Sequence, residues 1–315
     1  MKAVIVEEPG GFENLHIGDT PNPKGEIVIK VKHAGLNPID VNTIKGKTNY
    51  KISPFPHIPG AEIAGIVEES KNDKFKPGDR VIVYPRFFDN SCTYCISGKQ
   101  HLCEFGGIYG ATSNGGFAEF FAAPAMNFLK IPDAVDFEDA VGLPVGGLTS
   151  YHALLEANLK AGERVLVVGA SGNTGQYAVI LSKIFGAEVY FYSRKKWLTD
   201  YGAIEWKGET VDLIINSLGT EFFKNFLPYL NKEGRIVTFG TYTGKLTEID
   251  LAYLYTGERK IIGSTGGTLS ELQDLLRIVK NYRIKTKVWK HFKYTEIKEA
   301  LQQYDSKDGR IIIDF

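Results

Sequence analysis

Short runs of β-branched residues dominate the first 125 residues of the chain. The segments KAVIV (2–6), EIVIKVKHAG (26–35), AEIAGIVEE (61–69) and DRVIVY (79–84) have the apolar, β-branched character of strands. Stretches rich in Gly and Pro, such as PNPKG and FPHIPG, separate these runs. So many breakers between short strands predict a compact, barrel-like β fold with irregular loops.

The pattern changes near residue 130, where apolar strands begin to alternate with helical periodicity. Residues 163–193 read as strand, glycine turn, amphipathic helix and strand, and residues 211–240 repeat that order. The last stretch, 263–315, predicts two helices and a final strand. Strands that alternate with helices predict a parallel, doubly wound sheet. The expected fold class is therefore α/β, with a β-rich domain followed by a doubly wound domain.

Composition narrows the possible partners. The chain has 315 residues, which suggests about two domains. Lys+Arg and Asp+Glu both number 37, so the formal net charge is zero and neither a nucleic acid nor a membrane surface is expected as a partner. The N-terminal sequence MKAVIVEEPGG lacks the pattern of a signal peptide, and no apolar run approaches the roughly 18 residues of a membrane-spanning helix. We expect a cytoplasmic protein that acts on a small molecule.

The segment VLVVGASGNTGQ carries glycines directly after an apolar strand and at the opening of a helix. In that context a glycine-rich turn brings backbone close to a pyrophosphate, and the helix N-terminus supplies free N–H groups. A strand-to-helix turn that binds nothing is the alternative. The residues expected to contact a dinucleotide here are Gly169, Ser171, Gly172, Asn173, Thr174 and Gly175.

The second strand of this domain ends at the sequence SRKK. An NAD-preferring site places Asp or Glu there to bind the ribose 2′-hydroxyl, whereas an Arg accommodates a 2′-phosphate. The chain offers Ser193, Arg194 and Lys195 and no acidic residue. The sequence thus predicts NADP(H) as the cofactor, with Arg194 as the main contact. The alternative is a solvated basic start of a helix.

Residues in the loops after the later strands of this domain are further candidates for contacts with the cofactor. Ligands of doubly wound sheets bind beyond the carboxyl ends of the strands, although ordinary turns compete with this interpretation. The candidates are Asn216, Gly240, Thr241, Ser264 and Thr265.

The order of motifs along nearly the whole chain resembles the medium-chain dehydrogenase/reductase superfamily. The motifs are GLNPIDVNTIKG, PGAEIAGIVEE, FKPGDRV, GGFAEF, LPVGGLTSYHAL, ERVLVVGASGNTG and the terminal GRIIIDF. The resemblance implies a GroES-like catalytic domain built from both chain ends, 1–127 and 263–315. Between them it implies a Rossmann domain at 128–262 and hydride transfer to or from a nicotinamide.

All three cysteines of the chain lie within fifteen residues of one another, in DNSCTYCISGKQHLC. Clustered cysteines in a cytosolic protein favour a metal or redox role. Zinc-containing members of the family hold a structural zinc with four thiolates, and the spacing here matches the last three. The first position is Asp89, whose carboxylate is an acceptable zinc ligand. The resemblance implies one structural zinc in a lobe at 85–104, held by Asp89, Cys92, Cys95 and Cys103. The alternative is three reduced thiols in a decayed site.

At the positions of the family's catalytic zinc ligands, this chain has residues other than the family's ligands. They read Asn37, Ala61 and approximately Val145, and only Glu62 of the neighbouring motif carries a carboxylate. One carboxylate does not hold a catalytic zinc. We therefore expect no catalytic metal.

The motifs GLNPID and LPVGG resemble the zinc-independent quinone oxidoreductase and enoyl reductase branch. This resemblance predicts an NADPH-dependent reductase of quinones or α,β-unsaturated carbonyls. It places Asn37 near the nicotinamide, Asp40 at the floor of the cleft and Thr149 at the nicotinamide end. Tyr50 is a loose match to a proton donor. A plain Asx-capped turn is the alternative for residues 37–40.

Two other functions stay open at this point. One is an alcohol dehydrogenase or aldehyde reductase of the zinc type that recruits a metal through Glu62, and the other is a non-catalytic NADPH-binding redox sensor. None of the six histidines has a convincing partner in the sequence. The predicted last strand of the Rossmann sheet, 259–264, has an open edge that favours a homodimer or homotetramer.

Overall fold

The computed structural model describes residues 1–48, 50, 52 and 55–315. They divide into two compact units, Met1–Val145 with Thr268–Phe315, and Gly146–Gly267. The boundaries predicted from the sequence, 127/128 and 262/263, differ from this division. Residues 128–145 belong to the first unit because strand β9 pairs with β5 and helix α3 packs against β3 and β4.

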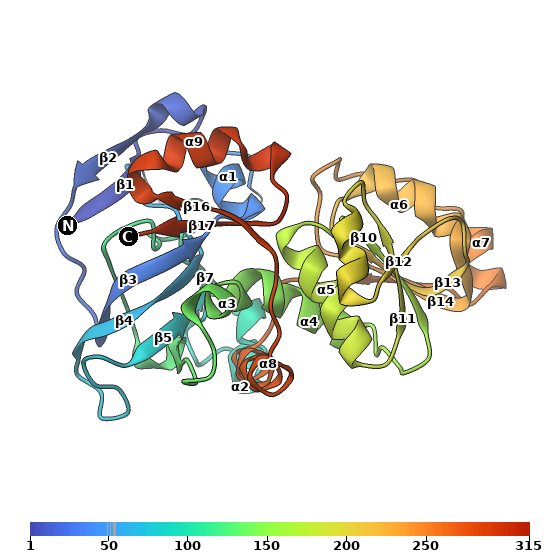
Figure 1. Cartoon of the computed structure of the whole chain (residues 1–315), viewed down its shortest axis with the longest axis horizontal. Helices are drawn as coiled ribbons and strands as arrows, with labels where there is room; N and C mark the ends of the chain where they lie inside the picture. Colours follow the sequence, from blue (N-terminus) through green and yellow to red (C-terminus); the bar gives the residue numbers. More distant parts are fainter. Residues whose placement is uncertain (49, 51, 53–54) are drawn as a thin grey trace. The chain divides into compact units, whose positions relative to one another are not determined.

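The first unit is built around a sheet of seven strands. Their order is β16-β17-β3-β4-β5-β9, and β8 also pairs with β3. Strands from the two ends of the chain therefore lie side by side, as the red β17 and the blue β3 show in Figure 1. The strands of the sheet are β3 (Ile27–Gly35), β4 (Glu62–Ser70), β5 (Arg80–Val83), β8 (Phe120–Ala123), β9 (Phe128–Lys130), β16 (Val288–Lys293) and β17 (Arg310–Asp314).

Two strand pairs and several helices complete this unit. The pairs are β1 (Lys2–Val6) with β2 (Leu15–Asp19), and β6 (Arg86–Phe87) with β7 (Gly107–Ile108). The helices are α1 (Pro38–Ile44), α2 (Thr93–Ile96), α3 (Phe137–Val141), α8 (Leu269–Tyr282) and α9 (Ile297–Gln302).

Alternation along β3 places its apolar side chains in two different hydrophobic cores of the first unit. On β3, Ile27, Ile29 and Val31 are fully buried and pack with residues of β4, β5 and β8. On the same strand Ala34 belongs to the other core, with Ile311 and Ile313 of β17. Side chains of a strand point alternately to opposite faces, so one strand with apolar residues on both faces supplies both cores.

The second unit is a parallel sheet of six strands with helices. The strand order is β12-β11-β10-β13-β14-β15, and every pairing is parallel. The strands are β10 (Arg164–Val168), β11 (Glu188–Tyr192), β12 (Ile204–Glu205), β13 (Val211–Asn216), β14 (Leu230–Thr238) and β15 (Lys260–Gly263), and the helices are α4 (Leu148–Glu156), α5 (Asn173–Ile184), α6 (Thr220–Phe226) and α7 (Leu251–Thr256).

Counted from β10, this order is 3-2-1-4-5-6, that of a dinucleotide-binding sheet. The chain reverses direction across the sheet between β10 and β13, which is where ligands of such sheets bind. The predicted α/β fold class, a β-rich domain with a doubly wound parallel sheet, is confirmed.

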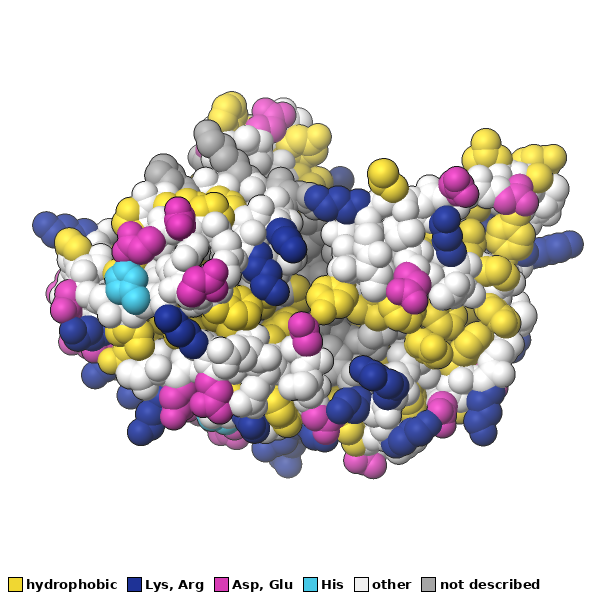
Figure 2. Space-filling view, turned by 90° about the horizontal axis from the view of Figure 1, so that it is seen from above, with side chains coloured by type: hydrophobic (Ala, Val, Ile, Leu, Met, Phe, Trp, Pro, Cys, Tyr) yellow, Lys and Arg dark blue, Asp and Glu magenta, His cyan; other side chains and the backbone are white. Residues whose placement is uncertain are grey.

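Charged side chains of both signs are interspersed over the face that Figure 2 shows. This agrees with equal numbers of basic and acidic residues in the sequence. Among the described residues, no helix combines the length and the apolar character that crossing a membrane requires.

Candidate functional site

The Cys lobe brings its four predicted ligands together. Cys92 precedes the first residue of α2, Cys95 lies within it, and Cys103 follows a single helical turn at Gln100–Leu102. One ligand atom from each of Asp89, Cys92, Cys95 and Cys103 lies within 4.8 Å of all the others. The Sγ atoms of Cys92 and Cys103 are 3.9 Å apart, and the Sγ of Cys103 is 3.1 Å from Asp89 Oδ1. This set of donors suits tetrahedral zinc.

The pKa values of two of the four ligands, Cys95 and Asp89, are shifted in opposite directions. Burial raises the pKa of the Cys95 thiol to about 12, so without a cation this sulfur stays protonated. Zinc binds thiolates and deprotonates a coordinating thiol. The hydroxyl of Ser91 donates to the carboxylate of Asp89 and holds its pKa well below the usual range, so this ligand is ionised. All four ligands come from the protein, which is the arrangement of a structural site and leaves no open position for a substrate.

The glycine turn of the second unit has the shape that the sequence predicts. Gly169 follows β10 with a φ of +75°, a conformation that favours glycine, and α5 begins at Asn173 with Gly172 as its cap. A Cβ on Gly175 would lie 2.2 Å from the carbonyl oxygen of Gly169. Only glycine therefore allows α5 to pack this closely on the turn, and its N-terminus faces the carboxyl end of the sheet.

The end of β11 lies against that turn. Ser193 Oγ donates to Ser171 Oγ over 3.1 Å, and the backbone N–H of Lys195 donates to Ser193 Oγ over 3.1 Å. Arg194 is exposed beside them, and residues 192–196 include no acidic side chain. The residues predicted to contact a 2′-phosphate therefore lie next to the glycine turn.

The other predicted cofactor loops lie at the carboxyl ends of β13, β14 and β15. Asn216 is buried and holds its turn, because its Oδ1 accepts the N–H groups of Leu218 and Gly219 at 3.1 and 3.0 Å. Gly240 and Thr241 follow β14, and Ser264 and Thr265 follow β15. Asn216 therefore shapes the edge from within, whereas the other four residues are at least partly accessible.

Asn37 and Glu62 form a buried pair in the first unit. Asn37 Nδ2 donates to Glu62 Oε2 over 3.0 Å, and the backbone N–H of Val145 donates to Glu62 Oε1 over 3.2 Å. Both oxygens of this carboxylate are therefore engaged. The resemblance placed Asn37, Ala61 and approximately Val145 at the family's catalytic zinc positions, and these three residues add no second ligating side chain to Glu62.

Asp40 is fully buried behind that pair. Its carboxylate accepts the backbone N–H groups of Asn37, Gly60 and Ala61 at 2.8, 3.2 and 3.0 Å. Burial outweighs these hydrogen bonds and raises the pKa of Asp40 to about 7. Since it touches no solvent, Asp40 can position the segments at 37 and 60 but does not line an open surface.

Tyr50 and Thr149 are the other two residues predicted to be catalytic. The ring of Tyr50 is 38% exposed and lies 6.0 Å from the guanidinium carbon of Arg86. Thr149 lies on α4 of the second unit. Catalytic roles for Asn37, Asp40, Tyr50 and Thr149 stay predictions.

A second group of metal-ligating side chains was missed by the sequence analysis. Nδ1 of His33 lies 2.7 Å from Asp314 Oδ1, and Nδ1 of His291 lies 3.1 Å from the same oxygen. The expectation that no histidine has a convincing partner is therefore wrong. The three residues come from β3, β16 and β17, and no spacing in the sequence connects them; only the sheet register could have found them.

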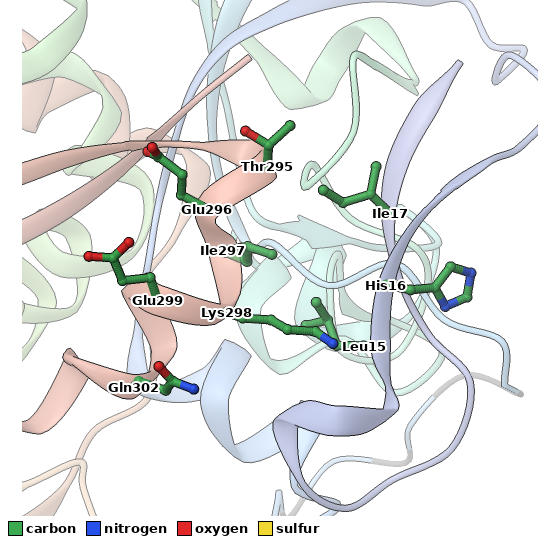
Figure 3. Close-up of a pocket in the computed structure, with 9 residues that line it drawn as sticks. All are labelled: Leu15, His16, Ile17, Thr295, Glu296, Ile297, Lys298, Glu299 and Gln302. Carbon is green, nitrogen blue, oxygen red and sulfur yellow. The ribbon is translucent and has the colours of Figure 1, made fainter.

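A cavity of about 660 Å³ lies between β2 and α9 with the turn that precedes this helix. Figure 3 shows Glu296 and Glu299 on the helical side and His16 on the strand side, pointing away from each other. It is lined by Leu15, His16, Ile17, Thr295, Glu296, Ile297, Lys298, Glu299 and Gln302. None of the predicted site residues lines it.

Two family models match the chain. Residues 23–133 match the alcohol dehydrogenase GroES-like domain, and residues 156–281 match the zinc-binding dehydrogenase model.

The relatives cover the whole length. An NAD-dependent alcohol dehydrogenase of Sulfolobus acidocaldarius is 30% identical over 97% of this chain and 96% of its own. An acryloyl-coenzyme A reductase of Metallosphaera sedula is 28% identical over 99% of each chain. The solved structure of a thermostable alcohol dehydrogenase from Pyrobaculum aerophilum superimposes with a TM-score of 0.94 at 34% identity, covering 100% of this chain and 99% of that one.

These findings correct the predicted activity. A quinone or enone reductase without a catalytic metal is contradicted, because two full-length relatives named alcohol dehydrogenases, at 30 and 34% identity, exceed the acryloyl-coenzyme A reductase at 28%. The second half of the chain matches a zinc-binding dehydrogenase model, and the described residues hold two groups able to bind a metal, not the Cys lobe alone. The prediction relied on the loss of ligands at three positions and overlooked the histidines. The chain belongs to the medium-chain dehydrogenase/reductase superfamily, within the zinc-type alcohol dehydrogenase family.

Proposed function

We propose that the protein is a nicotinamide-dependent alcohol dehydrogenase that also reduces the corresponding aldehydes or ketones. The observation that carries this proposal is the likeness to alcohol dehydrogenases over the full length of both chains. The glycine turn and the 3-2-1-4-5-6 strand order support the nicotinamide cofactor. The substrate class is a small primary or secondary alcohol.

A bound oxidised nicotinamide would accept at C4 the hydride from the carbinol carbon, whose C–H bond breaks. The hydroxyl proton would pass to water, and the substrate would become a carbonyl compound. A metal in such an enzyme polarises the substrate oxygen and eases loss of that proton. Asn37, Glu62 and Val145 do not fit a zinc ion, since one carboxylate with both oxygens hydrogen-bonded is the only ligating side chain among them. No step is assigned to a metal there.

The residues of the second unit bind and orient the cofactor. The N–H groups at the start of α5 and the turn at Gly169–Gly172 suit a pyrophosphate. Asn216 fixes the loop after β13, next to the point where the chain reverses across the sheet. The two oxygens of Glu62 hold Asn37 and the backbone of Val145, so this pair orients the neighbouring backbone.

We further propose that the cofactor is NADP(H). This rests on the exposed Arg194 next to Ser193 and on the absence of an acidic side chain from residues 192–196. The Sulfolobus relative is an NAD-dependent enzyme by name, and measured affinities for both cofactors decide the preference of this chain.

The activity is tested with a panel of primary and secondary alcohols and aldehydes, each with NAD(H) and NADP(H), before and after treatment with a chelator. We expect alcohol oxidation and aldehyde reduction at a common site. A protein that binds the cofactor but turns over no alcohol and no aldehyde would overturn the proposal. So would turnover confined to enones or quinones.

The cofactor proposal is tested with Arg194→Ala. Loss of a charge-assisted contact to a phosphate removes about 1.5–3 kcal/mol, or roughly 10–100-fold in NADPH affinity. NADH affinity should stay unchanged. Lys196→Ala is the matched control, because Lys196 is exposed on the same segment and pairs with Glu205. Equal NADPH affinities of the wild type and Arg194→Ala would refute the assignment.

We also propose a homodimer in which two copies of β15 pair. β15 is the last strand of its sheet, so one of its edges pairs with no other strand among the described residues, and an open edge invites pairing. Isologous contact of two such edges would continue the parallel sheets into one. Sedimentation measures the mass in solution, and a monomer at assay concentration would contradict this proposal.

A further inference from the structure

Three side chains on neighbouring strands of the first unit converge on one point. His33 lies on β3 and His291 on β16, and Asp314 lies on β17, the strand between them. The antiparallel register places Asp314 opposite His33. Because all three stand on paired strands, backbone hydrogen bonds fix their spacing.

The polar atoms of the group are close to the spacing of metal ligands. His33 Nδ1 is 2.7 Å from Asp314 Oδ1, and His291 Nδ1 is 3.1 Å from each oxygen of Asp314. One ligand atom from each residue lies within 4.8 Å of the others. Bonds of about 2.0–2.2 Å to zinc put tetrahedral ligand atoms roughly 3.5 Å apart. Small rotations of the two rings would therefore suffice to admit an ion.

Glu138 of α3 completes an arrangement that is common around metal-bound histidine. Its Oε2 lies 3.2 Å from Nε2 of His291, the ring nitrogen opposite the one that faces Asp314. A metal-ligating imidazole usually donates its other N–H to a carboxylate, which fixes the tautomer and the ring orientation. The ring of Phe137 packs edge-on against His33 at 6.0 Å. Both imidazoles are thus held in place from the same helix.

Ions in solution can reach the group. The side chains of His33, Asp314 and His291 are 24, 36 and 37% exposed. The site is therefore neither sealed in the core nor fully solvated, and it combines fixed geometry with an entry path.

We propose that His33, His291 and Asp314 bind a divalent first-row transition-metal ion such as Zn²⁺, and that Glu138 orients His291. Two neutral imidazoles and a carboxylate suit this class of ion. Three protein ligands leave a position for water or an anionic ligand, unlike the closed Cys lobe. The inference does not rest on the proposed function, since it concerns binding of the metal alone.

Cobalt separates the two metal groups of the chain, because thiolate ligands give Co²⁺ an intense charge-transfer absorption that nitrogen and oxygen ligands do not. The full chain is stripped with a chelator, dialysed and titrated with Co²⁺. We expect Co²⁺ to bind the Cys lobe with the thiolate absorption, and further Co²⁺ to bind without it. Cys103→Ser should abolish the thiolate absorption and keep the binding of Co²⁺ that occurs without it.

The second class of Co²⁺ should be lost in His291→Ala and in Asp314→Asn. Glu138→Gln should keep it with an affinity roughly 10–100-fold lower, the usual effect of removing an outer carboxylate. His16→Ala is the matched control, since His16 on β2 is an exposed histidine that faces the carboxylate of Glu7. This variant should bind as the wild type does.

Each result of these Co²⁺ titrations either supports or overturns the proposed metal site. If Cys103→Ser binds no Co²⁺ while its circular dichroism is unchanged, the proposal is overturned and the group is an ion-pair brace between strands. The same conclusion follows if folded His291→Ala and Asp314→Asn bind Co²⁺ as the wild type does. If the ligand variants fail to fold, Cys103→Ser and Glu138→Gln still give the answer.

Discussion

Asp40 is a carboxyl group that the fold holds away from water. It caps the start of α1 through the N–H of Asn37 and ties this helix to the backbone of Gly60 and Ala61, which precede β4. Two segments that are distant in the sequence meet at one side chain. The placement of Asn37 and Glu62 therefore depends on Asp40.

Replacing Asp40 with Asn should destabilise the protein by about 1–3 kcal/mol, because the new amide turns N–H groups toward backbone donors that lose their acceptor. The pKa of Asp40 rises from 3.8 to about 7 on folding. Its favourable contribution is thus complete below the lower value and is lost as the pH rises through the upper one. The gap in unfolding free energy between wild type and variant should shrink from pH 4 to pH 7.

Urea unfolding at several pH values measures this gap. Asp200→Asn, at an exposed position, serves as the control and should show no such trend. A gap that stays constant across the window would mean that Asp40 remains ionised in the folded protein.

At the scale of single residues, the sequence predicts local clusters far better than distant ones. Asp89 and the three cysteines are near neighbours in the chain, so their spacing alone predicts that they meet, and they do. His33 and Asp314 are 281 positions apart and meet only through the register of β3 with β17. Register depends on the packing of the whole sheet, which no local pattern contains.

At the scale of elements, the glycines of the turn have different roles: one is needed for packing and another for ligand binding. A Cβ on Gly175 would meet the backbone of Gly169 and Ala170 at 2.2 and 2.6 Å. On Gly172 the nearest atom is the Gly169 oxygen at 3.2 Å. Gly175 is therefore required by packing, whereas a Cβ on Gly172 would need a shift of only a few tenths of an ångström and would occupy space close to the expected pyrophosphate.

Gly175→Ala should therefore lower thermal stability, since either α5 or the turn must shift. Gly172→Ala should unfold near the wild-type temperature but bind NADPH and NADH more weakly, because its methyl group occupies space next to the helix N-terminus. Calorimetry and cofactor titration on both variants measure the two effects. Equal loss of stability in both would show that Gly172 is also a packing residue.

Long periodic elements are predictable from the sequence, whereas short ones are not. Residues 269–282 repeat apolar positions at helical spacing, and α8 spans that range with Leu272, Leu275, Leu276 and Val279 buried. A capping box of Thr268 and Glu271 fixes its start. By contrast, α2 has only four residues and follows the cysteine positions rather than any apolar period.

At the scale of the whole molecule, each unit has its own core and its own candidate ligand. The Cys lobe belongs to Met1–Val145 with Thr268–Phe315, and the glycine turn belongs to Gly146–Gly267. The resemblance predicted that both chain ends build one domain, and in the sheet of the first unit β17 pairs with β3 on one side and with β16 on the other. Apolar pattern alone does not predict that return, because it identifies strands but not their partners.

Hydrogen exchange should therefore respond unit by unit. Cys103→Ser removes a zinc ligand and should raise amide exchange in residues 86–108, because structural zinc contributes directly to folding energy. Exchange along β10–β15 should not change. Added NADPH should slow exchange at residues 169–175 and leave the lobe as it was. Faster exchange across both units in Cys103→Ser would contradict this independence.

The central place of β17 in its sheet has a consequence for protein synthesis. Residues 310–314 are translated after every other strand, yet they pair with β16 on one side and with β3 on the other. While the ribosome still holds them, the stretch of β3 from His33 to Gly35 lacks its partner, although the parallel sheet of Gly146–Gly267 has already emerged. A nascent chain at this stage thus has a complete parallel sheet while one edge of β3 is still open. Stalling of translation near this point should favour aggregation or chaperone capture.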